Sequence, residues 1–307
     1  MRVTWRFYPI AIVTESVITL TGFVEWLVAR HYRMILMAAA LALLPPLGVV
    51  GQAVVVLAVL TQGLATGIFV AAVATALMTV PAFISGTQPA ALLVLALVNW
   101  LPALGLAAVL ERTRSLSLTV QVATVVMMAA TIVYFMTGSP VDTWHGVLNE
   151  YIAAMGDRIP EVPAGFVPAV SRIMTGLLAA MTVLSSMLAV FIGRWWQSRL
   201  SNPGAFGSEF RGLRMGTVMG LVAGLVFIAA ALTKITLLEN LTLVLMTGFL
   251  LHGLAVTHTI AAAGIGSLFL PAIYVLIVVG MPYAEVALAG LGFVDNWFDL
   301  RSRVTRR

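Results

Sequence analysis

Four polar side chains lie inside long apolar stretches of this sequence and are the first candidates for chemistry: Gln52, Asn99, His252 and His258. A polar group in hydrocarbon is costly, so such residues often mark a substrate or proton pathway. Hydrogen bonding between helices is the alternative role, and the one that the sequence favours. The two histidines are six residues apart, about 120° around a helix, so they do not form the i, i+4 pair that binds a metal ion.

Catalytic motifs are missing from the sequence. It contains no Ser-His-Asp arrangement, no HExxH motif, no glycine-rich phosphate-binding motif and no pair of buried carboxylates on one helix face. There is no cysteine, which excludes thiol chemistry, disulfides and cysteine metal ligands. The sequence therefore predicts no enzyme, no catalytic residues, no metal site and no cofactor.

A second group of candidates lies between two apolar stretches, in the segment GRWWQSRLSNPGAFGSEFRGLR at residues 193–214. Membrane topology explains its arginines, headgroup contact explains its tryptophans, and Asn202-Pro203-Gly204 is a turn signal. These rules do not explain the remaining aromatic and acidic residues. We therefore expect a cytoplasmic loop that holds lipid phosphates or docks a partner. Its candidate residues are Arg194, Trp196, Asn202, Pro203, Gly204, Phe206, Glu209, Phe210 and Arg214.

Gly216, Gly220 and Gly224 follow this segment at intervals of four residues. Small residues at that spacing share one helix face and let two helix backbones approach closely in lipid. We expect this face to pack against another helix, either within the chain or in a second copy of it.

The composition indicates which elements must position these residues. Of the 307 residues, 61% are hydrophobic and only 9% are charged, whereas soluble domains are about 25% charged. So few charges cannot cover a globular surface, so we expect a lipid bilayer around the chain. The net charge of +5 comes from short loops and tails between apolar stretches, so no nucleic-acid partner is predicted. The N-terminus lacks the pattern of a removable signal.

The expected fold is an all-α polytopic transmembrane bundle with about eight to ten segments, some short or broken by proline. Residues 1–32 are predicted to form an N-terminal amphipathic part, 33–300 the transmembrane domain, and 301–307 a basic cytoplasmic tail. Within residues 10–29, Glu15 and Glu25 lie on one side and apolar residues on the other, which predicts a helix in the membrane interface. A first span with its glutamates facing the bundle is the alternative.

Pro45-Pro46 interrupts the next apolar stretch and predicts two short segments, 33–45 and 46–61, in a hairpin or broken pair. A break at membrane depth needs a cover of protein or water, so this region is either a cavity wall or a structural kink. Lys234, Glu239 and Asn240 are expected in a later turn. The other spans are predicted at about 64–84, 90–110, 117–136, 167–192, 215–236, 241–261, 266–281 and 284–297.

Residues 137–165 form the one long polar loop. Apolar residues in it share one helical stripe, which predicts a short amphipathic helix on the outer surface, ended by Pro160 and Pro163. A lid over an outward-facing pocket is the alternative. The stripe consists of Trp144, Leu148, Tyr151, Met155 and Ile159.

Basic residues set the expected orientation. In this arrangement 14 of the 17 Lys and Arg residues fall on one side of the membrane, and six of the 12 acidic residues fall on the other. The positive-inside rule then places both termini in the cytoplasm of a bacterial cell, with the chain in its inner membrane. The 14 are Arg2, Arg6, Arg30, Arg33, Arg112, Arg114, Arg194, Arg199, Arg211, Arg214, Arg301, Arg303, Arg306 and Arg307.

Segment 193–214 resembles the signature of the YybS-like family of bacterial membrane proteins, from its Gly-Arg start to Leu213-Arg214, with Ala205 where that family often has glycine. The ending GLGFVDNWFDLR at 290–301 is similar to the family's ending, with Asp295, Asp299 and Arg301 in place. The resemblance runs from about Glu25 to the end of the chain.

The resemblance implies no established activity. The family is grouped with the substrate-binding membrane components of energy-coupling-factor vitamin transporters, which usually have six spans. An Ala-x-x-x-Ala pair of those components contacts the coupling subunit, and Ala38 and Ala42 have that spacing.

We therefore expect a transporter-like component that binds a small molecule and works with a separate energising subunit. The alternative is a membrane scaffold that docks a cytoplasmic partner through residues 194–214, or assembles with its own copies. A cavity lined by Gln52, Asn99 and His252 would favour the first function. A solid core with a basic and aromatic inner surface would favour the second.

Overall fold

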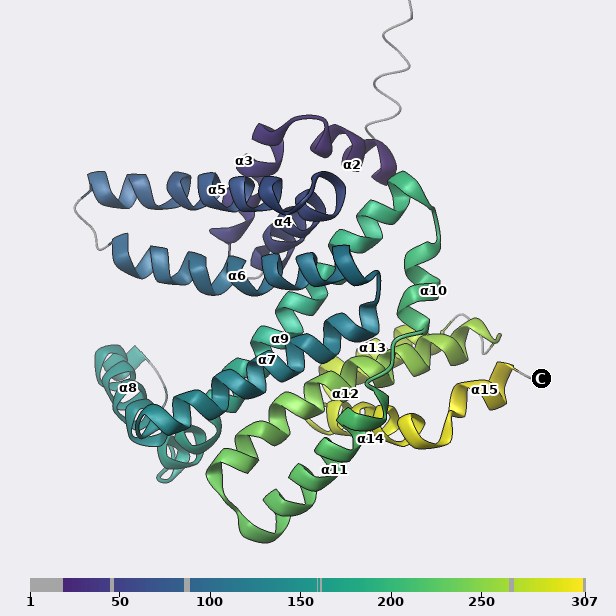
Figure 1. Ribbon diagram of the computed structural model, residues 1–307. Helices are drawn as coiled ribbons and strands as arrows, with labels where there is room; N and C mark the ends of the chain where they lie inside the picture. Colours follow the sequence, from purple (N-terminus) through teal and green to yellow (C-terminus); the bar gives the residue numbers. More distant parts are fainter. Residues whose placement is uncertain are drawn as a thin grey trace, which may run out of the picture. The chain divides into compact units, whose positions relative to one another are not determined.

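A computed structural model describes residues 19–44, 47–85, 89–158, 160, 162–264 and 268–305. Every regular element among these residues is a helix (Figure 1), so the predicted all-α class is confirmed for them. The chain divides into two compact units. The first comprises Met1–Arg114 and Ser186–Ser208, and the second comprises Ser115–Ser185 and Glu209–Arg307.

Five helices are long and apolar enough to cross a membrane: Leu92–Thr113, Leu116–Thr137, Phe166–Ser201, Gly216–Thr233 and Thr236–Ala262. Three shorter apolar helices are Gly48–Gln62, Leu64–Val80 and Phe269–Val279. Each of these eight lies within one of the predicted apolar segments or extends it.

The first unit begins with α2 (Leu20–Val28), α3 (His31–Ala42) and α4 (Gly48–Gln62). Thr19 caps α2, because its Oγ1 accepts the N–H of Gly22 at 3.1 Å. Nine residues are too few to span a bilayer, and residues 10–18 of the predicted helix lie outside the described residues. α3 and α4 run antiparallel, since His31 at the start of α3 contacts Gln62 at the end of α4, with Nε2 and Oε1 2.7 Å apart. This is the arrangement predicted for a proline-broken hairpin, although Pro45 and Pro46 are outside the described residues.

Helix α4 is the centre of the first unit. Residues 51–59 are all buried, as expected for a helix that is apolar on every side. α5 (Leu64–Ile84) and α6 (Pro89–Thr113) run side by side next to it. The end of α9 (Phe166–Ser201) also packs on α4: a Cβ at Gly193 would lie 2.7 Å from Val56, and Gln197 Nε2 donates to the Leu60 carbonyl at 2.6 Å.

The second unit is built around α12 (Thr236–Ala262). α7 (Leu116–Thr137), the start of α9, α11 (Gly216–Thr233) and α14 (Tyr283–Phe298) surround it, and α13 (Phe269–Val279) and α15 (Leu300–Thr305) complete the unit. α12 and α14 approach most closely at two glycines. A Cβ on Gly253 would overlap the carbonyl oxygen of Leu288, and a Cβ on Gly292 would overlap that of Phe249.

Helix α8 (Pro140–Met155) lies within the long polar loop, where an amphipathic helix was predicted. Trp144 is half-buried and its Nε1 donates to Thr175 Oγ1 on α9 at 2.9 Å. Leu148 and Met155 are also half-buried, whereas Tyr151 on the predicted stripe is 59% exposed. Ile159 is outside the described residues.

Threonines within the apolar helices satisfy their own hydroxyls. Oγ1 of Thr124, Thr242 and Thr247 each donates to the carbonyl four residues earlier, at 2.9, 2.9 and 3.0 Å. In hydrocarbon no water can accept these protons, so the backbone carbonyl takes that role.

Two predicted loops are wrong in their extent. Residues 194–201 continue α9 as a helix, and residues 205–211 form α10 (Ala205–Arg211), because the only strong turn signal in the segment is Asn202-Pro203-Gly204, with Gly204 at φ 92°. Glu239 and Asn240 belong to α12, because the chain turns earlier, at Lys234 with φ 52°. Residues 301–305 of the predicted tail are also helical, as part of α15.

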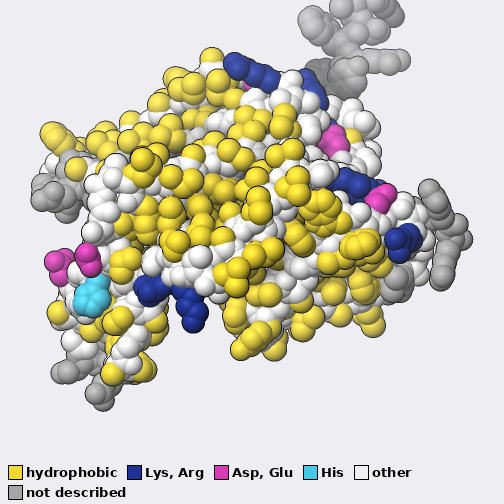
Figure 2. Space-filling model, turned by 60° about the horizontal axis from the view of Figure 1, so that its bottom comes forward, with side chains coloured by type: hydrophobic (Ala, Val, Ile, Leu, Met, Phe, Trp, Pro, Cys, Tyr) yellow, Lys and Arg dark blue, Asp and Glu magenta, His cyan; other side chains and the backbone are white. Residues whose placement is uncertain are grey.

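The face shown in Figure 2 is largely apolar. Hydrophobic side chains cover broad areas of the face shown, and Lys and Arg lie in a few separate groups. Large apolar side chains are strongly exposed on several helices, including Phe83, Leu232 and Val279 at 74%, 80% and 79%. Apolar patches of this extent indicate contact with hydrocarbon.

Candidate functional site

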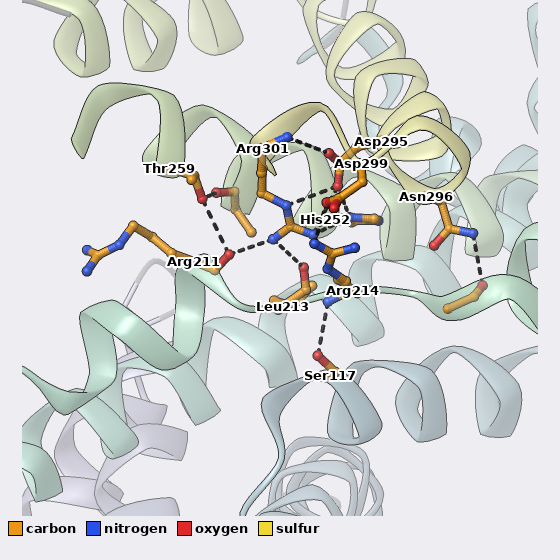
Figure 3. A network of polar contacts seen from close by, with 12 residues as sticks. Ser117, Arg211, Leu213, Arg214, His252, Thr259, Asp295, Asn296, Asp299 and Arg301 are labelled. Atoms are coloured by element: carbon orange, nitrogen blue, oxygen red, sulfur yellow. Dashed lines mark hydrogen bonds and ion pairs between the residues drawn. The ribbon is translucent and has the colours of Figure 1, made fainter. Parts of the chain in front are cut away.

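The second unit contains a buried ionic network formed by His252 of α12, Asp295 of α14 and Arg301 of α15 (Figure 3). Oδ2 of Asp295 lies 3.0 Å from His252 Nε2 and accepts the Nε–H of Arg301 at 3.0 Å. Arg301 Nη2 lies 3.0 Å from the same histidine nitrogen. All three side chains are at most 6% exposed. One anion and one guanidinium are therefore paired away from water.

The backbone explains how Arg301 reaches Asp295. α14 ends at Phe298, and the left-handed φ of 45° at Asp299 turns the chain back. The N–H of Arg301 then donates to Asp295 Oδ1 at 3.3 Å. Its Nη1 donates to the carbonyls of Arg211 and Leu213, at 2.5 and 3.1 Å. The network thus joins the ends of α14 and α15 to the turn that follows α10.

One atom of this network has no partner among the described residues, Nδ1 of His252. If Nε2–H donates to Asp295, Nδ1 is an unsatisfied acceptor. If Nε2 instead accepts from Arg301, Nδ1–H is an unsatisfied donor. With neutral histidine the three side chains sum to zero charge, which limits the cost of burying them.

An exposed ion pair lies beside the buried network. Arg214 Nη2 contacts Asp299 Oδ1, with 47% and 46% of the two side chains exposed. The hydrogen bond from the Arg214 guanidinium lowers the pKa of the Asp299 carboxyl below its ordinary value. Arg211, Arg214, Arg301 and Thr259 line an open depression of about 380 Å³ here, and the Arg211 side chain points away from the network (Figure 3).

A larger cavity of about 540 Å³ lies elsewhere in the second unit. Residues from 177–184 of α9, 243–250 of α12 and 281–286 at the start of α14 line it. The walls are leucine, methionine, valine, alanine and proline, with Thr247 and Glu285 as the only polar side chains among the lining residues.

Two of the predicted pathway residues meet in the first unit. Gln52 Nε2 donates to Asn99 Oδ1 at 2.6 Å, and the buried Gln52 Oε1 has no partner among the described residues. Asn99 also lines a cavity of about 290 Å³, together with Ala42, Gly48 and Trp100. Ala42 and Gly48 flank the proline pair, so this cavity is close to the predicted break in the helix.

The two predicted histidines have separate surroundings. His258 lies in the last turns of α12, 2.9 Å from the hydroxyl of Tyr274 through Nε2 and edge-on to the ring of Phe210. His252 belongs to the ionic network. Gln52 and Asn99 belong to the first unit, so the structure does not describe one cavity lined by them and His252. Among the described residues, no three His, Asp or Glu side chains are grouped as metal ligands.

The predicted glycine face packs within the chain against α14. A Cβ on Gly220 would lie 2.5 Å from Asn296 Nδ2 and 3.1 Å from the Trp297 ring, whereas one on Gly224 would have ordinary contact with Phe293 at 3.7 Å. Gly216 is the first residue of α11 and has a φ of 79°, so it forms the turn.

The predicted docking residues are only partly on the surface. Trp196 is 6% exposed and its ring packs edge-on against Phe23 of α2. The ring of Phe206 packs against Phe191 within the first unit, and that of Phe210 against His258 within the second. Arg194 donates to Gln197 Oε1 at 2.6 Å, and Glu209 is partly buried. Exposed residues are Asn202, Pro203, Gly204 and Arg214.

Sequence reasoning missed the roles of Asp295, Arg301 and Glu285. Asp295 and Glu285 are carboxylates in an otherwise apolar stretch of α14, which is the costly placement that marked Gln52 and Asn99 as candidates. Arg301 carried no such signal, because it lies in a basic tail and only the turn at Asp299 brings it inside.

No family model, curated protein or solved structure matches this chain in comparisons of these three kinds.

Proposed function

We propose that this chain is a polytopic protein of a bacterial inner membrane that binds a small molecule as the membrane component of a transport system. The cavity of about 540 Å³ in the second unit carries the proposal. Small-molecule sites are typically concave, mostly apolar and about 300–1,000 Å³, with a few polar groups that orient the ligand. This cavity has that size and composition.

The membrane part of the proposal is supported by helix lengths. Five helices are long enough to span, and three shorter apolar helices accompany them. α3, the other arm of the α3–α4 hairpin, and α14 are the ninth and tenth segments that we propose, and an even number of crossings returns the chain to the side on which it began. Both termini are proposed to lie in the cytoplasm, because Arg211, Arg214 and Arg301 gather at one end of the second unit.

We retain the YybS-like resemblance as part of this proposal, but without the alanine contact that it suggested. Ala38 is fully buried. Gly51 of α4 packs against it, since a Cβ on Gly51 would lie 3.1 Å from the carbonyl oxygen of Ala38. An energising subunit cannot reach Ala38 in this arrangement. We place no such subunit on α3.

The scaffold function has weaker support. Its aromatic residues Trp196, Phe206 and Phe210 pack against other parts of the chain and leave little aromatic surface for a partner. Trp195, with Arg199 over its ring at 5.7 Å, remains on the surface, as expected for a residue at lipid headgroups.

The cavity is tested by filling it. Wild-type protein and the variant Ala180→Phe are purified into nanodiscs of one lipid composition, and their extracted small molecules are compared by mass spectrometry. Ala180 lines the cavity and is 8% exposed. We expect a compound that accompanies the wild type and is depleted from Ala180→Phe.

The control is Leu178→Phe, which adds a ring at a neighbouring exposed position of α9 that does not line the cavity. It should retain the compound. Leu250→Phe, which changes a residue of α12 that also lines the cavity, replaces Ala180→Phe if that variant fails to give a monodisperse protein. Equal small-molecule content in wild type and both cavity variants would reject the proposal.

A further inference from the structure

Glu285 is the only charged residue that lines the large cavity of the second unit. It is the third residue of α14 and is partly exposed. No described residue forms an ion pair with it. A carboxylate beside an apolar wall loses part of its hydration, and a cation in the cavity would compensate that loss.

The walls offer no such cation. Segments 177–184, 243–250 and 281–286 contain no Lys, Arg or His. The negative charge is instead favoured by the N-terminal turn of α14, where unpaired backbone N–H groups give a partial positive charge. The N-terminal turn of α14 therefore stabilises the Glu285 carboxylate, but the net negative charge at the cavity remains.

The other lining side chains suit an apolar body. Met181, Met246 and Met281 come from three different segments of the wall. Methionine side chains are flexible and polarisable, so they adapt to ligands of irregular shape. Thr247 offers little to a polar ligand, because its hydroxyl donates to the Leu243 carbonyl.

We propose that the cavity binds an organic cation with an apolar body, and that Glu285 is its counter-ion. The positive group lies at the carboxylate, and the apolar part lies between α9 and α12. This inference rests on the proposed small-molecule function and names the class of its ligand.

Two ions of nearly equal shape and opposite charge test the inference. Binding of tetraphenylphosphonium and of tetraphenylborate is measured by equilibrium dialysis against full-length protein in nanodiscs, with binding to empty nanodiscs subtracted. We expect wild type to bind the cation at least about tenfold more tightly than the anion, and Glu285→Gln to lose about tenfold or more in cation affinity, the loss expected when a partly desolvated counter-ion is removed.

Glu239→Gln is the matched control. It removes the same charge from α12 in the same unit, but Glu239 pairs with Arg172 at 3.0 Å and does not line the cavity. Its cation affinity should equal that of the wild type.

The failures are distinguishable. If Ala180→Phe abolishes binding of both ions while Glu285→Gln changes neither, the cavity binds ligands without charge selection, and only the inference on the cation is wrong. If the wild type binds the two ions equally and Glu285→Gln changes neither affinity, the inference on the cation is also wrong, and the cavity is an apolar groove that takes acyl chains. If Ala180→Phe changes neither the binding of the ions nor the small molecules that accompany the purified protein, the proposed function fails with the inference.

Discussion

At the scale of residues, the buried charges of Asp295 and Arg301 are paired and hydrogen-bonded, and His252 Nδ1 is the one atom of their network without a partner among the described residues. Asp295 accepts two hydrogen bonds from Arg301 and lies beside His252, while Arg301 is also held by two carbonyls. A buried pair of this kind adds little net stability compared with apolar side chains, but removal of one partner leaves a charge without compensation. Its structural effect is to fix the turn at residues 211–213 against the end of α14.

Replacing Asp295 with Asn should therefore be strongly destabilising. It leaves the Arg301 guanidinium buried without an anion, and we expect a loss of about 3–5 kcal/mol in the free energy of unfolding. Denaturant unfolding of the detergent-purified protein measures it. The double variant Asp295→Asn/Arg301→Gln should lose less than Asp295→Asn alone, because no unpaired charge remains; a larger loss would contradict the electrostatic explanation.

The exposed pair of Arg214 and Asp299 predicts a pH dependence. Arg214 lowers the pKa of Asp299 below 3.8, so the pair stabilises the folded state fully above that pH, and the contribution is lost as the pH falls through the lowered pKa. Asp299→Asn keeps a residue that tolerates the left-handed turn. Its melting temperature should be slightly below that of wild type by the same amount from pH 8 to pH 5, since exposed pairs contribute little.

As the pH falls below 3.8 and through the lowered pKa of Asp299, the two melting temperatures should converge. A difference that persists unchanged in acid would mean that Asp299 acts through its backbone turn and not through its charge.

At the scale of elements, close approach of helices depends on glycines that face one another. α12 and α14 approach at Gly253 and Gly292, and α9 meets α12 at Gly176, where a Cβ would lie 2.6 Å from the Asn240 backbone. Asn240 completes that contact: its Oδ1 accepts the Gly176 N–H and its Nδ2 donates to the Arg172 carbonyl. Lipid supplies no hydrophobic force between helices, so small residues and hydrogen bonds hold them together.

Two glycines of α14 make a matched test of this packing. A Cβ on Gly292 would overlap the Phe249 carbonyl, whereas a Cβ on Gly290 would have no atom within 4 Å. Gly292→Ala should lower the free energy of unfolding by about 1–3 kcal/mol or more through overpacking. Gly290→Ala should leave it unchanged or raise it by up to about 1 kcal/mol, because alanine is the better helix former. Equal effects in thermal unfolding would reject the contact.

At the scale of the whole molecule, charge and hydropathy set how the chain relates to a bilayer. The exposed apolar side chains on α5, α11 and α13 are suited to contact with lipid acyl chains. Within the second unit, the arginines around the ionic network are gathered at one end. In the first unit, His31 and Gln62 meet at one end of the α3–α4 hairpin, with Gln197 bonded to the neighbouring Leu60 carbonyl.

The positive-inside rule predicts that the C-terminus lies on the cytoplasmic side of the membrane. Alkaline phosphatase fused after Arg307 should be inactive in bacteria, and green fluorescent protein at the same position should fluoresce. Alkaline phosphatase inserted after Gly146, in the exposed part of α8, should be active and serves as the control. Activity of the Arg307 fusion would invert the topology.

The sequence by itself determined the class of this protein and most of its helices. In lipid the backbone can satisfy its polar groups only within helices or closed barrels, and apolar segments of about 20 residues select the helix. The positions of α5, α6, α7 and α11 therefore follow from hydropathy and turn residues. It also indicated the Gln52 and Asn99 pair as costly polar groups, although not that they bond to each other.

Only the tertiary structure decided which side chains meet. Arg301 belongs to a basic tail in the sequence, and the turn at Asp299 brings it to Asp295. Glu285 is an acidic residue in the first turn of a helix, and only the packing of α9 and α12 beside it forms the half-open cavity. The extent of α9 through Ser201 likewise depends on packing of Gly193 and Trp196 against other helices. Periodicity specifies which face of a helix is apolar, but the partner of that face is set by long-range packing, which local sequence does not encode.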